Sequence, residues 1–291
     1  MLFEIAVGLI VLLAIVLFRP LWFMNGFASF QSGTRIRDLA YDLDPRHKSD
    51  LYIPKAVDKN KSIIVFVHGG AWDAGHKNDY AFAGKAFSEM GYIAQIPNYR
   101  LFPQAKYPQF IKDVATAIRA LPSQLREVGL KVEGSLNIVL VGHSAGAHTV
   151  AMLATQPDYL KNVPVEIKSI IGLAGPYDLP LDDPLVVGKF DGVELYEHKD
   201  LGHEHNQHEA NPINLATSEA PPMLLIHGDK DVTVGPYHTQ RFAKRLTELG
   251  VDHKVITYPH VDHRQLVGGL AKIFRFLNPV WRDIKAYLNT L

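Results

Sequence analysis

The segment from Asn137 to Ala154 constrains the fold more than any other part of the chain. An apolar run, Ile138 to Val141, leads into Gly-His-Ser-Ala-Gly centred on Ser144, and helix-forming residues come next. Glycines two positions before and after a serine allow a very tight turn between a strand and a helix, with the serine at its tip. We therefore predict a strand, a sharp turn and a helix that together expose Ser144 as a nucleophile.

The rest of the chain alternates short apolar runs with longer amphipathic segments. We expect strands near residues 35–41, 50–54, 61–67, 92–96, 138–141, 166–173, 223–226 and 253–258. We expect helices near residues 78–90, 108–128, 237–249 and 264–288, besides the helix after Ser144. Strands that alternate with helices of this length are typical of α/β proteins. We predict a mostly parallel eight-stranded sheet that opens with a hairpin and is flanked by helices.

Residues 180–216 depart from this alternation because they show no clear hydrophobic period. They fall where an insertion over the active site is expected, and we interpret them as a small cap. The predicted catalytic domain spans residues 35–291, and residues 25–34 form a polar linker before it. A chain of 291 residues, 47% of them hydrophobic, can bury one core of this size.

Composition excludes several functions. Thirty basic and thirty acidic side chains cancel and no basic block occurs, so nothing favours binding of nucleic acid. The sequence has no cysteine, which excludes disulfides, thiolate metal sites and a cysteine nucleophile.

The first 24 residues are predicted to be a membrane anchor or a signal segment. Residues 5–18 form an apolar run, and Arg19 separates it from a second apolar patch at residues 21–24. Together these residues could cross a bilayer, whereas the first run alone has the length of a secretory signal. A small-x-small site at residues 26–28 is compatible with cleavage and export. Three alternatives therefore stay open: a retained anchor, with the side of the membrane undecided, a cleaved signal, and a buried helix of the folded domain.

Two strand ends after Ser144 carry the residue types that activate a serine. In open α/β sheets, ligands bind at the carboxyl ends of the strands. The strand near 223–226 is followed by Asp229 and Asp231, and the strand near 253–258 by His260 and His263. We favour Asp231 as the orienting carboxylate because Asp229 is more typical of a turn, and we favour His263 as the base over a loop histidine.

A third strand end supplies backbone donors for an oxyanion. The strand near 61–67 ends in His68-Gly69-Gly70-Ala71-Trp72. Glycines let the backbone approach a substrate closely, and N–H groups aimed at the developing charge stabilise it. The N–H of Ala145, directly after the nucleophile, is expected to be a second donor.

These motifs resemble those of α/β-hydrolases of the hormone-sensitive-lipase-like esterase group. The similarity is greatest to the branch that holds kynurenine formamidases, isoprenylcysteine methylesterases and feruloyl-esterase-like enzymes. The matching segments are HGGAW (68–72), NYRLFP (98–103), GHSAGAH (142–148), GPYDL (175–179), HGDKDVTV (227–234) and YPHVDH (258–263). The resemblance implies a Ser144, Asp231 and His263 triad, with Gly70, Ala71 and Ala145 as oxyanion donors. Lipases have a third glycine where this chain has Ala71.

The expected reaction is hydrolysis of short- to medium-chain acyl esters through an acyl-enzyme, without a metal or organic cofactor. An amide hydrolase acting on an arylformamide such as N-formylkynurenine is the alternative, and a non-catalytic binding protein is a remote one. Trp72 and Tyr177 are candidates for the acyl pocket. The histidines of the cap, His198, His203, His205 and His208, do not complete the zinc motif H-E-x-x-H, and no metal role is expected.

Overall fold

The computed structural model describes residues 25–26, 33–195 and 206–291. The predicted N-terminal segment, residues 1–24, lies outside these ranges. Within them, no helix combines the length and the apolar character needed to cross a membrane.

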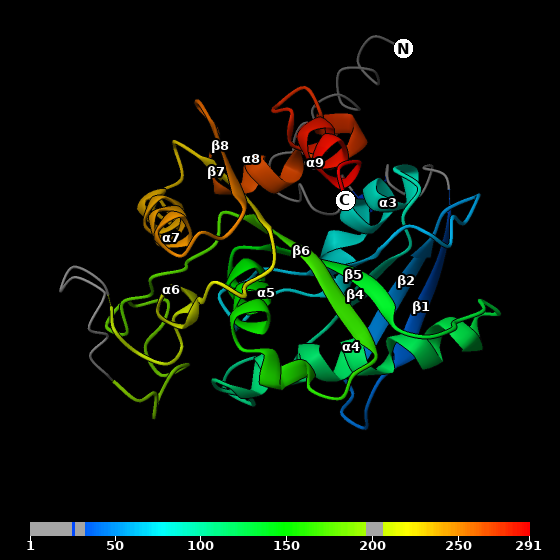
Figure 1. The fold of residues 1–291 in the computed structure, drawn as a ribbon, viewed down its shortest axis with the longest axis horizontal. Helices are drawn as coiled ribbons and strands as arrows, with labels where there is room; N and C mark the ends of the chain where they lie inside the picture. Colours follow the sequence, from blue (N-terminus) through cyan, green and yellow to red (C-terminus); the bar gives the residue numbers. More distant parts are fainter. Residues whose placement is uncertain (1–24, 27–32, 196–205) are drawn as a thin grey trace, which may run out of the picture.

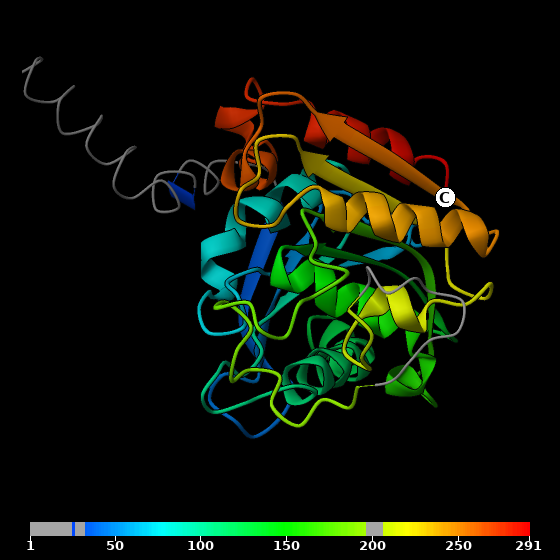
Figure 2. The same ribbon diagram turned by 90° about the vertical axis from the view of Figure 1, so that its left-hand side faces the viewer.

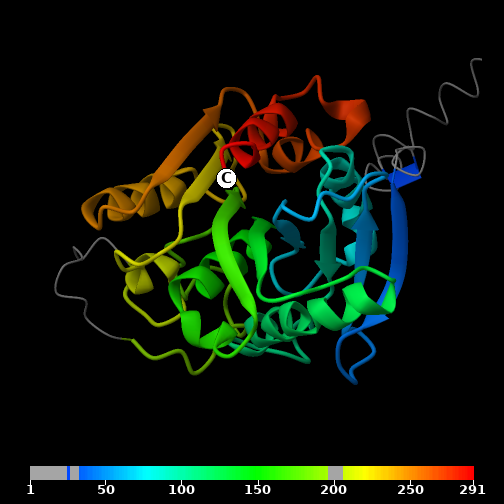
Figure 3. The same cartoon turned by 45° about the vertical axis from the view of Figure 1, so that its right-hand side comes forward.

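The described strands form a single sheet of eight, as predicted (Figure 1). They are β1 (Thr34–Ala40), β2 (Lys48–Ile53), β3 (Ile63–Val67), β4 (Ala94–Pro97), β5 (Leu136–His143), β6 (Val165–Leu173), β7 (Met223–Gly228) and β8 (His253–Tyr258). Their order is β1-β2-β4-β3-β5-β6-β7-β8, with β1 and β8 at opposite edges (Figure 3). The predicted hairpin of β1 and β2 is antiparallel, β2 pairs antiparallel with β4, and all other pairs are parallel.

The helices cover both faces of this sheet. They are α3 (Ala81–Glu89), α4 (Gln109–Glu127), α5 (Ala145–Thr155), α6 (Pro212–Leu215), α7 (Tyr237–Glu248), α8 (His263–Gly268) and α9 (Val280–Leu288), with short 3-10 turns η1 (Lys77–Tyr80), η2 (Pro157–Leu160) and η3 (Lys272–Phe274). Helices α4, α5 and α7 pack on one face, and α3, α8 and α9 pack on the other. Helix α7 runs alongside β7 and β8 (Figure 2).

The central strand β3 shows why both faces must be covered. Its five residues are all buried, and they alternate between the two cores. Val65 and Val67 belong to the core under α4 and α5, whereas Ile64 and Phe66 belong to the core under α3 and α9. A strand buried on both sides reads as a continuous apolar run, which is the pattern that its sequence shows.

The single closing helix predicted for residues 264–288 is wrong. Helix α8 ends at Gly268, and α9 begins only at Val280. The Asn278 side chain donates to the Gln265 carbonyl at 2.6 Å and accepts from the Val280 N–H, so it stabilises the break. A side chain at Gly269 would overlap that of Asn278, which explains the glycine. Apolar residues on both sides of the break made the segment resemble one long helix.

Of the predicted cap, residues 180–216, the structure describes residues 180–195 and 206–216. In these residues α6 is the only helix, and an isolated bridge joins Leu195 to His208. Phe190 packs against Trp72 and stacks on Tyr107, with ring centroids 4.9 and 5.5 Å apart. The described part of the cap is therefore attached to the core by aromatic side chains.

Candidate active site

Ser144 occupies the tight turn between β5 and α5. Its backbone is in an unusual conformation for a residue with a side chain, with φ 56° and ψ −124°. A Cβ at Gly142 would lie 2.3 Å from the Gly146 carbonyl oxygen, and one at Gly146 would lie 2.1 Å from that of Val67. Both glycines are therefore sterically required, and the strain at Ser144 is maintained by close packing around it.

Asp231 and His263 are in direct contact. The Nδ1–H of His263 donates to Asp231 Oδ2 at 2.6 Å. The other carboxylate oxygen accepts the backbone N–H groups of Thr233 and Val234, at 3.0 and 2.9 Å. These contacts fix the carboxylate and leave Nε2 of His263 without the proton, which is the tautomer that a general base requires.

Asp231 stays ionised although it is buried. Burial by itself raises the pKa of this carboxyl, but the hydrogen bonds from His227 and His263 outweigh it and hold the pKa well below its usual range. Nε2 of His227 lies 3.3 Å from Asp231 Oδ2 and donates to the Val234 carbonyl at 2.9 Å. His227 is thus a supporting residue that sequence reasoning did not single out, although it belongs to the quoted HGDKDVTV motif.

His143 lies next to Ser144 in the sequence and contacts His263 in the structure. It directly precedes Ser144, and its Nε2–H donates to the backbone carbonyl of His263 at 3.1 Å. Its ring lies 4.7 Å from that of His263, and Tyr80 donates its hydroxyl proton to Nδ1 at 3.1 Å. Burial, and then the nearby His263, hold the pKa of His143 well below its usual value, so it packs there as a neutral ring. Sequence reasoning treated His143 only as the variable position of the turn.

The loop after β3 lies against the nucleophile. A Cβ built on Gly69 would come within 3.0 Å of Ser144 Cβ, which measures how closely the two backbones approach. Gly70 and Ala71 have positive φ values of 125° and 46°. Among the described residues, none accepts a hydrogen bond from the backbone N–H of Gly70, Ala71 or Ala145. Binding of an oxyanion by these three N–H groups stays a prediction.

His68 supports this loop from within. It is fully buried, its Nδ1–H donates to the Gly69 carbonyl at 2.8 Å, and its ring stacks on Tyr99 at 4.4 Å. The Tyr99 hydroxyl in turn donates to the His68 carbonyl at 3.0 Å. Burial lowers the pKa of His68 to about 3, so this histidine is neutral and structural.

The two candidate pocket residues lie in the core. Trp72 is 2% exposed and meets His148 edge-on, with centroids 5.2 Å apart. Tyr177 is fully buried, its ring 4.8 Å from Phe242 and its hydroxyl against Gly172. Contact with an acyl group stays a prediction for both residues.

Asp229, which was not chosen as the orienting carboxylate, and His208 of the cap both make structural hydrogen bonds. Asp229 accepts the backbone N–H of His260 at 2.6 Å and so closes the loop that precedes His263. His208 is buried and donates to the Leu179 carbonyl at 2.8 Å, whereas the other cap histidines lie outside the described residues. Elsewhere in the described ranges, no group of three or more His, Cys, Asp or Glu residues could hold a metal ion.

The eight-stranded sheet and the strand–serine–helix turn define an α/β-hydrolase. Residues 49–246 match the BD-FAE family, and the chain belongs to it. His263 lies beyond the matched range, so its assignment depends on the geometry given above.

The chain is also similar to curated proteins that are named as esterases. A probable isoprenylcysteine alpha-carbonyl methylesterase ICMEL1 of Arabidopsis thaliana is 29% identical over 283 residues, which covers 89% of this chain and 58% of the relative. Esterase LipC of Mycobacterium tuberculosis is 28% identical over 226 residues, covering 72% of this chain and 54% of the relative. The chain thus spans little more than half the length of these two relatives.

Solved structures of the same fold include a truncated carbohydrate esterase from gut microbiota, with a TM-score of 0.70 and 20% identity. That match covers 89% of this chain and 96% of the other. Esterase B of Lactobacillus rhamnosis matches with a TM-score of 0.68 and 16% identity, over 91% and 92% of the two chains. At these identities the likeness shows the fold alone.

Proposed function

We propose that the protein is a serine carboxylesterase that cleaves short- to medium-chain acyl esters. The observation that carries the proposal is the 2.6 Å contact between His263 and Asp231 beside the strained turn of Ser144. The names of the methylesterase and esterase relatives support an ester as the substrate.

In the proposed reaction, Nε2 of His263 takes the hydroxyl proton of Ser144 as its oxygen attacks the ester carbonyl. The free N–H groups of Gly70, Ala71 and Ala145 stabilise the oxyanion. Protonated His263, stabilised by Asp231, then gives the proton to the departing alcohol. Water activated by the same histidine hydrolyses the acyl-enzyme and restores Ser144.

A series of p-nitrophenyl esters from acetate to palmitate tests this function. The wild-type protein should show its highest kcat/KM at a short or medium chain, and Ser144→Ala should lose at least about 10⁴-fold in kcat. Because serine and alanine are similar in size, circular dichroism should show an unchanged fold. If the folded wild type hydrolyses none of these esters but cleaves N-formylkynurenine, the arylformamidase alternative replaces this proposal.

We further propose that residues 1–24 attach the protein to a membrane, with export after cleavage as the alternative. The apolar run at residues 5–18 and the apolar patch at 21–24 support attachment. Flotation of the full chain with lipid vesicles tests it, and release of the protein by alkaline carbonate would contradict a spanning anchor.

A further inference from the structure

The segment between α8 and α9 presents apolar side chains to solvent. Phe276 is 78% exposed, the most exposed aromatic side chain among the described residues, and its neighbour Leu277 is 37% exposed. Trp281 lies in the first turn of α9 and is half-buried. A single exposed apolar side chain is ordinary, but adjacent ones next to a tryptophan suggest a contact surface.

Helix α9 packs on the core through one face and presents the residues of its other sides away from the core. Its buried residues, Val280, Ile284 and Leu288, are spaced four apart and pack in the core under the sheet. Trp281, Arg282 and Lys285 therefore lie on the other sides of the helix. The packing of α9 on the core therefore fixes the positions of these three residues.

Basic side chains surround the apolar ones. The side chains of Lys272 and Arg282 are 65% and 76% exposed. The charged ends of Arg275 and Lys285 lie 4.0 and 5.1 Å from the centre of the Trp281 ring. The acidic partners nearby are Glu89, which pairs with Lys272 and Arg275, and Asp283 beside Arg282. Four basic groups against two acidic ones leave this surface positive.

This surface is close to the point where the N-terminal segment joins the domain. Asn25 accepts the N–H of Phe82 at 3.0 Å and donates to the Asn78 carbonyl at 2.9 Å, at the start of α3. At the other end of α3, Glu89 pairs with Arg275 at 2.5 Å. A helix of nine residues spans about 12 Å, so the two attachments are near each other.

We propose that Lys272, Phe276, Leu277, Trp281, Arg282 and Lys285 form an interfacial patch that lies on the surface of an anionic lipid bilayer. Phe276 and Leu277 insert among the headgroups, Trp281 lies at the boundary, and the basic groups pair with lipid phosphates and carboxylates. Aromatic side chains favour that boundary, and Lys and Arg side chains are attracted to an anionic lipid surface. The inference depends on the membrane attachment proposed for residues 1–24, because that segment would bring the patch to the bilayer.

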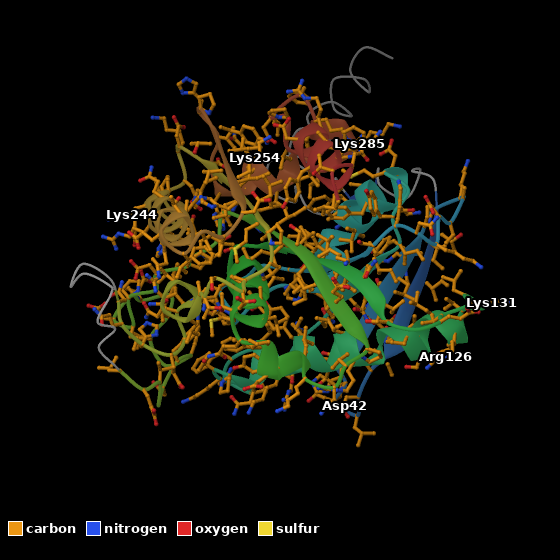
Figure 4. All side chains as sticks on the ribbon, in the orientation of Figure 1. Asp42, Arg126, Lys131, Lys244, Lys254 and Lys285 are labelled. Atoms are coloured by element: carbon orange, nitrogen blue, oxygen red, sulfur yellow. The ribbon has the colours of Figure 1, made fainter. Side chains whose placement is uncertain are left out.

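The absence of cysteine makes a site-specific test direct. Phe276→Cys in the full chain is labelled with a nitrobenzoxadiazole dye and reconstituted into vesicles of phosphatidylcholine and phosphatidylserine that carry nitroxide lipids. Leu43→Cys is the matched control because Leu43 is 98% exposed. It adjoins Asp42, which lies on the opposite side of the molecule from Lys285 (Figure 4). We expect blue-shifted emission and several-fold stronger lipid quenching at residue 276 than at residue 43.

Charge reversal tests the patch independently of the anchor at residues 1–24. In the labelled Phe276→Cys protein, we combine Lys272→Glu, Arg282→Glu and Lys285→Glu, and expect quenching to fall to the level of the control. The matched variant combines Lys131→Glu, Lys244→Glu and Arg126→Glu, exposed residues with the same total change in charge that lie away from α9 (Figure 4). This variant should keep the quenching.

Four outcomes would overturn the patch. Equal quenching at residues 276 and 43, in protein that still floats with vesicles, rejects the patch and leaves the anchor intact. A label at residue 276 that is shielded from iodide but not quenched by lipid means that protein covers the site. Self-quenching that grows with protein density means that a second copy covers it. If the full chain does not float at all, the anchor itself has failed, and the patch proposal fails with it.

Discussion

At the residue scale, the site depends on which of two nearby carboxylates orients the base. Asp231 and Asp229 are two positions apart, yet Asp231 contacts His263 whereas Asp229 contacts a loop N–H. An asparagine in place of either aspartate keeps the shape of the side chain and removes its charge. Substitution at each position therefore separates the orienting role from the loop-closing role.

We predict that Asp231→Asn lowers kcat by about 10⁴-fold, because an amide in that position favours the wrong tautomer of His263. Asp229→Asn should keep kcat within about tenfold, since its oxygen can still accept the His260 N–H. Steady-state hydrolysis of a p-nitrophenyl ester measures both. Equal losses in the two variants would contradict the assignment.

At the element scale, the strand β5, the turn and the helix α5 form one rigid unit. The turn forms because Gly142 and Gly146 leave room that a side chain would fill. Its glycine spacing was sufficient to predict the local geometry. The contact of His143 with His263 was not predictable, because it joins residues 120 positions apart in the chain.

We predict that Gly146→Ala lowers the free energy of unfolding by at least about 2 kcal/mol, because its Cβ would overlap the Val67 carbonyl. Gly268→Ala in α8 is the control, since nothing lies within 4 Å of the added Cβ. It should change stability by less than about 1 kcal/mol. Urea unfolding followed by circular dichroism compares them, and similar losses in both variants would rule out the steric explanation.

At the scale of the whole molecule, buried neutral histidines make the free energy of unfolding depend on pH. Burial lowers the pKa of His68 and His148 to about 3 and that of His238 to about 4. In the unfolded chain these imidazoles recover a pKa near 6.5. The unfolded state therefore binds more protons than the folded state below that pH.

We predict that the folded protein is most stable above about pH 6.5 and loses stability as the pH falls toward 4. Each of these histidines contributes a slope of up to about 1.4 kcal/mol per pH unit once the pH is below the unfolded pKa. Urea unfolding at pH 7, 6 and 5 measures the slope. A free energy of unfolding that is constant from pH 7 to pH 5 would contradict the neutral buried state.

Local sequence patterns were enough to predict the α/β class, the eight strands, the turn of Ser144 and the residue types at three strand ends. These features are local, because they depend on hydrophobic period, glycine spacing and the residues directly after each strand. The folded structure was needed to show that Tyr177 faces the core and that the closing helix breaks between Gly268 and Val280. It was also needed to show that His143 contacts the base and that His227 contacts its carboxylate. The Tyr177–Phe242 and His143–His263 contacts join segments far apart in the chain, so packing across the sheet creates them and no local pattern encodes them. The helix break and the His227–Asp231 contact lie within short stretches of chain, but they depend on side-chain hydrogen bonds and ion pairs that hydrophobic period does not report.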